Sequence, residues 1–275
     1  MAEMIEAVID DDHPHKPPME REELRDVISL SLWAGQMLLQ NGADSQKVEE
    51  TVHRLGTQLG CDWMDVVVLY DSIIATTLNN REFRTKARRA PGRGVNLEKI
   101  VQINDLSYQA MRGELDRFVL RRELRRIDKL SPNYGRWTVV LFVGLACAAF
   151  ARLFGGDLAA MTITFLAAAI GMAIRQQMAL AYFNPILTTI VTAFVASLVA
   201  SVGVLLKLGA QPAVAISAAV LLLVPGVPLI NASEDLLNGQ IINGLARGTW
   251  GLILSLAIAL GIAMTLWLTG IKIAL

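Results

Sequence analysis

Four polar residues, Asn231, Glu234, Asp235 and Asn238, stand in the most apolar half of the chain and carry groups that can bind a solute or a proton. At helical spacing they fall within an arc of about 100°. A carboxylate at the centre of a bilayer costs about 2.5–3.5 kcal/mol on insertion scales. These acids therefore need water or a cationic partner. Arg247 and Arg175 are the available cations.

A helix break precedes this polar arc, at Pro225, Gly226 and Pro228. Each proline removes a backbone donor and frees the carbonyl four residues earlier. Freed backbone at membrane depth is tolerated only inside protein or beside a water-filled cavity. The stretch is either an interfacial connector or a discontinuous transporter helix, in which the break lines a path for solute. The break favours the transporter helix, because a connector needs no break before it reaches water.

The candidate substrate-binding residues follow from this interpretation. They are Asn231, Asp235, Glu234, Asn238, Arg247 and Arg175, with Pro225, Gly226 and Pro228 lining the path.

Charge divides the chain into a soluble half and a membrane half. Only 5 of the 25 Lys and Arg residues follow Arg136, and only 3 of the 25 Asp and Glu residues do. We expect an acidic, Pro-rich disordered tail over 1–19, a cytoplasmic domain over 20–135 and a transmembrane domain over 136–275.

The soluble half is predicted to be α+β. Helical periodicity runs over 20–40, and Asp44 or Ser45 can cap a second helix that ends at Gly60. Further helices are expected after Asn96 and over 114–130; strands are expected over 64–78, with a turn near Asp71, and over 81–89. The basic run at 121–126 is either a solvated helix face or an anchor to anionic lipid, and its position before the first apolar segment favours the anchor.

The membrane half is predicted to be all-α, with five spans that are each long enough to cross a bilayer. The basic first half places the N-terminus in the cytoplasm, and five spans then place the C-terminus in the periplasm. The expected spans are 137–154, 158–174, 185–206, 212–230 and 249–271.

Several function classes lack their signatures. The net charge of zero argues against a nucleic-acid partner, and no phosphate-binding loop or catalytic triad is visible. The three histidines have no metal-ligand spacing, so neither a metal nor another cofactor is expected. Cys61 and Cys147 lie in different halves, and we interpret both as free thiols.

The stretch VPGVPLINASEDLLNGQIINGLARG (224–248) resembles the threonine/serine exporter family, as do NGADSQKVEE (41–50) and VNLEKIVQINDL (95–106). Full-length members have ten spans, whereas this sequence has five and resembles the split form. The resemblance implies a second five-span membrane subunit and an oligomeric exporter in the bacterial inner membrane. It also implies export of threonine and serine or of a dicarboxylate such as succinate. Without a nucleotide motif, transport would be driven by an ion gradient, with Asp235 or Glu234 as proton carrier.

Two other classes are weaker alternatives. A membrane-anchored enzyme needs a nucleophile–base pair or a metal cluster in the soluble half, and none is found. A regulatory scaffold leaves the broken fourth span unexplained.

Overall fold

The chain forms two compact units, of which each is described separately. The computed structural model describes residues 16–79, 82–91, 94–130, 134–208, 211 and 213–271. The first unit comprises 1–131 together with 227–248, and the second comprises 132–226 and 249–275. Most of the expected tail, residues 1–15, and the expected first residue of the fourth span, Pro212, lie outside the described residues.

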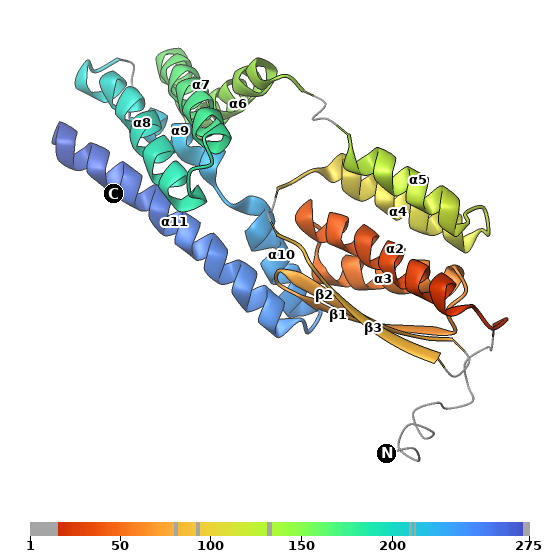
Figure 1. Ribbon diagram of the computed structural model, residues 1–275. Helices are drawn as coiled ribbons and strands as arrows, with labels where there is room; N and C mark the ends of the chain where they lie inside the picture. The colour runs from red at the N-terminus through yellow and green to blue at the C-terminus, as the bar shows by residue number, and fades with distance from the viewer. Residues whose placement is uncertain are drawn as a thin grey trace. The chain divides into compact units, whose positions relative to one another are not determined.

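The first unit is α+β, as the sequence predicted (Figure 1). Three antiparallel strands in the order β1-β2-β3 form its sheet. Helices α2 and α3 cover one face of this sheet, and α4 and α5 pack on the far side of that helix pair. The elements are α2 (Arg21–Gln40), α3 (Ser45–Gln58), β1 (Trp63–Leu69), β2 (Ser72–Asn79), β3 (Glu82–Arg89), α4 (Leu97–Met111) and α5 (Arg117–Asp128).

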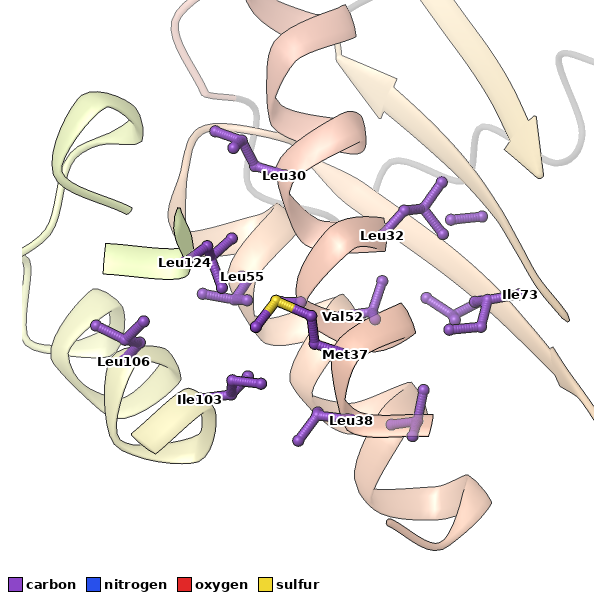
Figure 2. Packing of buried hydrophobic residues seen from close by; sticks show 14 of the residues in the cluster. Leu30, Leu32, Met37, Leu38, Val52, Leu55, Ile73, Ile103, Leu106 and Leu124 are labelled. Atoms are coloured by element: carbon purple, nitrogen blue, oxygen red, sulfur yellow. The ribbon is translucent and has the colours of Figure 1, made fainter. Parts of the chain in front are cut away.

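The core of this unit lies between the sheet and the helices (Figure 2). Alternate residues of β1 and β2 are buried, as expected for strands with one face toward a core. Figure 2 shows Leu32 and Met37 of α2 beside Val52 of α3 and Ile73 of β2. Leu124 of α5 and residues of α4 close the other side of the helix pair.

Side-chain caps fix where the helices of the first unit begin. Asp44 accepts a hydrogen bond from the Lys47 N–H at 2.7 Å, and Asn96 accepts one from the Lys99 N–H at 3.1 Å. Both were predicted as caps. A cap satisfies one of the backbone donors left free in a first helical turn. Residues 16–19 of the expected tail are described, and the backbone N–H of Lys16 donates to the carboxylate of Asp62.

Helices make up the second unit. They are α6 (Arg136–Leu153), α7 (Leu158–Leu180), α8 (Pro185–Leu205), α9 (Ala213–Ala219), the 3₁₀ turn η1 (Val220–Leu223) and the later part of α11 (Ile241–Thr269). Among the residues that the structure describes, four helices are long and apolar enough to span a membrane, namely α6, α7, α8 and α11. A fifth span results if the bent pair of Ala213–Leu223 and α10 (Gly226–Leu237) is counted as one. The chain is therefore a multi-pass membrane protein.

Small residues let the helices of the second unit approach closely. A buried cluster joins Ala167, Ala200, Ala215, Ile216 and Ala219. The hydroxyls of Ser197 on α8 and Thr265 on α11 lie 2.6 Å apart and share a hydrogen bond. Small side chains and interhelical hydrogen bonds are the usual means by which membrane helices associate.

Both cysteines are free, as predicted, and both are buried. Burial is the main cause that raises the pKa of the Cys61 thiol above its ordinary value. That thiol is therefore protonated and unreactive near neutral pH.

Candidate functional site

Asp235 is the most deeply buried of the predicted polar residues, with 1% of its surface exposed. Its Oδ1 accepts the backbone N–H of Ser45 at 3.0 Å, and its Oδ2 accepts the Ser45 hydroxyl at 3.1 Å. Ser45 is the first residue of α3, where free N–H groups and the helix dipole favour an anion. Asp44 caps this helix locally, and Asp235 adds a second acceptor from far along the chain.

Arg247 accompanies Asp235 and is also buried, with 5% of its surface exposed. Its Nε lies 3.0 Å from Oδ2 of Asp235 as an ion pair, although the N–H is not aligned for a hydrogen bond. Its two Nη groups donate to the Ala43 carbonyl at 3.1 Å and to the Ser45 hydroxyl at 3.4 Å. The guanidinium thus holds the carboxylate and the backbone before α3 together.

Asn231 completes this arrangement, because its Nδ2 donates to the Gly42 carbonyl at 2.8 Å. We call Asn231, Asp235 and Arg247, with residues 42–45, the elbow network. All of its members belong to the first unit.

Gln240 and Asn243 lie beside the elbow network, and the sequence analysis did not find them. Gln240 donates to Glu49 at 3.1 Å, and Asn243 donates to the Val68 carbonyl at 2.8 Å. Ser45 was predicted only as a helix cap. The sequence offered one signal of this contact, namely two adjacent capping residues, Asp44 and Ser45. Because one residue is enough to cap the helix, the other can bind a distant partner.

A close helix contact shapes the turn between α10 and α11. A Cβ at Gly244 would lie 2.6 Å from Leu236 Cγ and 3.0 Å from the Ala232 carbonyl oxygen. Only glycine at 244 allows α11 to approach α10 this closely, and a Cβ at Gly248 would lie 3.7 Å from Ala232 Cβ, so both glycines face α10. This contact brings Arg247 to the side of α10 that carries Asp235.

The four residues of the predicted polar arc do not act as one set. Asn231 and Asp235 are four residues apart and share one buried stripe of α10, whereas Glu234 and Asn238 are exposed on the next stripe. The structure therefore joins Asn231 and Asp235 with Arg247, and leaves Glu234 and Asn238 outside the elbow network.

Arg175 belongs to the second unit and contacts the backbone just before the helix break. Its Nη1 donates to the Leu222 carbonyl at 3.2 Å. The carbonyls that the two prolines free are taken locally: Leu221 accepts from the Val224 N–H at 3.2 Å, and Val224 accepts from the Gly226 N–H at 2.8 Å. The Leu222 carbonyl, which the Gly226 N–H would reach in a continuous helix, is left for Arg175.

The prolines fit the break without loss of a needed hydrogen bond. Pro228 stands in the first turn of α10, where backbone donors have no partner within the helix. A Cβ built at Gly226 meets no atom of the described residues within 4 Å, so there is open space beside the break.

Known proteins resemble this chain over most of its length. The family model described as "Putative threonine/serine exporter" (ThrE) matches residues 29–269. A Klebsiella aerogenes protein named "Probable succinate transporter subunit YjjP" is 37% identical over 253 residues, which are 90% of this chain and 96% of that protein. Its namesake from Escherichia coli is 36% identical over 257 residues, 92% of this chain and 99% of that protein.

A third similar protein covers less of the chain. It is an uncharacterized protein from Haemophilus influenzae, 33% identical over 140 residues, which are 50% of this chain and 46% of that protein. No solved structure matches the chain.

Proposed function

The chain belongs to the threonine/serine exporter family, and on that premise we propose that it is one subunit of a secondary exporter of small polar metabolites. The names of its relatives support two further parts of the proposal: a dicarboxylate such as succinate among the solutes, beside threonine and serine, and a second membrane subunit as partner. Because the family is one of exporters, we propose that this chain moves solutes and is not an enzyme.

The broken fourth span is the observation that carries the proposal. Its two prolines interrupt an apolar stretch, and a charged side chain, Arg175, donates to backbone at the break. Discontinuous helices of this kind provide polar backbone and helix ends to solutes in other secondary transporters. We propose that Pro225, Gly226 and Pro228 line the path, with Arg175 beside them.

The elbow network has a place in the same proposal. We propose that Asn231, Asp235 and Arg247 serve the path from the soluble side and that Asp235 is the proton carrier, while Glu234 and Asn238 are peripheral. The buried ion pair supports this, because ionisable residues of transporters that pair with one another often belong to proton relays. Each of the three residues is hydrogen-bonded to residues 42–45.

The orientation belongs to the proposal as well. The basic first half supports a cytoplasmic N-terminus in the bacterial inner membrane. Five spans, with the bent pair counted as one, then put the C-terminus in the periplasm.

Uptake into inverted membrane vesicles tests the function. Vesicles that hold this chain with a second five-span subunit are expected to accumulate labelled succinate, threonine or serine, whereas vesicles with this chain alone are not. Equal uptake by vesicles without this chain would refute the proposal.

A further inference from the structure

Three helical segments of the second unit meet at Gly171. A Cβ at this position would lie 3.1 Å from Ala196 Cβ, and 3.6 Å from both Thr192 Cγ2 and Leu222 Cδ2. Helix α7, helix α8 and the turn η1 therefore come together at one point. The helix break follows directly after this point.

Two threonine hydroxyls near this point have no hydrogen-bond partner. Thr188 and Thr192 are 7% and 0% exposed, and within the described residues the Oγ1 atom of each is buried and unpartnered. Their neighbours behave differently: Thr189 donates to the Pro185 carbonyl at 2.9 Å, and Ser197 donates to the Ala193 carbonyl at 2.7 Å. A buried hydroxyl without a partner is destabilising and calls for an explanation such as an absent ligand.

Arg175 lies at the same level as these hydroxyls. Helices α7 and α8 run antiparallel and are joined by the short connection 181–184. One helical turn from Gly171 toward that connection reaches Arg175, and one turn from Thr192 in the same direction reaches Thr188. The guanidinium and the two hydroxyls thus border the same region, next to the Leu222 carbonyl that Arg175 contacts.

Arg175 gives this region of the second unit a positive charge. In the part of the chain that the structure describes, no carboxylate lies in an ion pair with Arg175. Asp157 is the sole acidic residue in the sequence of the second unit, and it caps the opposite end of α7 through the Ala160 N–H at 2.9 Å. Arg175 is exposed and donates a hydrogen bond to the Leu222 carbonyl, and an anion is the natural complement of a guanidinium with further donors.

We propose that Arg175, Thr188 and Thr192 form the binding site for a carboxylate of the transported solute. The guanidinium binds the carboxylate oxygens, and the two hydroxyls donate hydrogen bonds to them, since neither hydroxyl has a partner among the described residues. Because the second unit has no acidic residue besides Asp157, at the opposite end of α7, it provides no carboxylate at this site to hold an ammonium group, and the site favours a dicarboxylate over a zwitterionic amino acid. This inference rests on the proposed transport function and deepens it, since it names the solute class.

Equilibrium binding of radiolabelled succinate and threonine to the full-length chain, reconstituted with its second subunit, tests the site. Thr188→Val and Thr192→Val remove a hydroxyl at nearly constant volume. Each is expected to weaken succinate binding about tenfold or more, because a hydrogen bond to a charged group is lost. The melting temperature without solute should be unchanged or higher, since an unpartnered buried hydroxyl is replaced by a methyl group.

Thr189→Val is the matched control, because the Thr189 hydroxyl is already bonded within its own helix. It should bind succinate within about twofold of the unmodified chain. Arg175→Lys keeps the charge but loses bidentate geometry, so it should retain part of the affinity that Arg175→Gln loses.

The outcomes separate this site from the transport function. Succinate binding and transport by the unmodified pair, with unaltered binding by Thr188→Val and Thr192→Val, would overturn the site and leave the function standing. Threonine bound more tightly than succinate would overturn the preference for dicarboxylates. Absence of binding and transport of both solutes by the unmodified pair would overturn the function and the site together.

Discussion

Replacement of Asp235 by Asn should destabilise the first unit strongly, whereas the same change at Glu234 should not. Asp235 accepts two hydrogen bonds from Ser45 and is paired with Arg247, and all three residues are buried. Removal of one partner of a buried ion pair costs about 3–5 kcal/mol, because the remaining charge is left uncompensated. With a shift of about 2–4 °C per kcal/mol for a domain of this size, the melting temperature should fall by about 6–20 °C.

Melting of the purified chain and hydrogen exchange of the peptide covering 42–50 are the two measurements. Exchange should accelerate at the start of α3, since the Ser45 N–H loses its charged acceptor. Glu234→Gln is the matched control, because Glu234 is exposed on the adjacent position of the same helix. The double change Asp235→Asn/Arg247→Gln should recover part of the loss, because it leaves no unpaired charge. If Asp235→Asn melted together with Glu234→Gln and left the exchange unaltered, our account of the elbow network would be wrong.

Three further results are expected. Asn231→Ala should lower the stability of the first unit by about 1–3 kcal/mol in a melting experiment, because the Gly42 carbonyl loses its donor; an unchanged melting temperature would contradict this. The double change Pro225→Ala/Pro228→Ala should keep or raise the melting temperature, since a helix favours Ala over Pro by about 3 kcal/mol. Flux into vesicles should nevertheless be lost, because the Leu222 carbonyl would accept a hydrogen bond within the continuous helix. Retained flux would show that the break is a simple helix boundary. A reporter active only in the periplasm and fused after Leu275 should be active, and its silence at normal expression would reverse the proposed orientation.

Local signals were sufficient to predict most of the fold. The caps Asp44 and Asn96, the β-branched residues of β1 and β2 and the apolar length of α6 and α8 each depend on residues close together in sequence. Some helices extend beyond the predicted spans. Helix α7 continues past Arg175 to Leu180 and α11 begins at Ile241, because a charged residue with a tertiary partner does not end a helix.

The candidate site was predictable only in part. Helical spacing identified Asn231 and Asp235, and composition identified Arg247 as an available cation. The partner loop 42–45 lies 190 residues from Asp235 and carries no signal of the contact beyond a second capping residue. In the sequence, Thr188 and Thr192 look like ordinary threonines of an apolar helix. Only the structure shows that their hydroxyls have no hydrogen-bond partner among the described residues.

The first unit is assembled from two stretches of chain, 1–131 and 227–248, and this has a consequence for biosynthesis. Ser45 leaves the ribosome 190 residues before Asp235. At about 5–20 residues per second, the N-terminal stretch waits about 10–40 s for its last helix turns. During this interval the membrane helices α6–α8 are synthesised, so the first unit can be completed only after them. A fragment that ends at residue 131 is therefore an unfinished domain, and a stable soluble version should carry 227–248 on a linker.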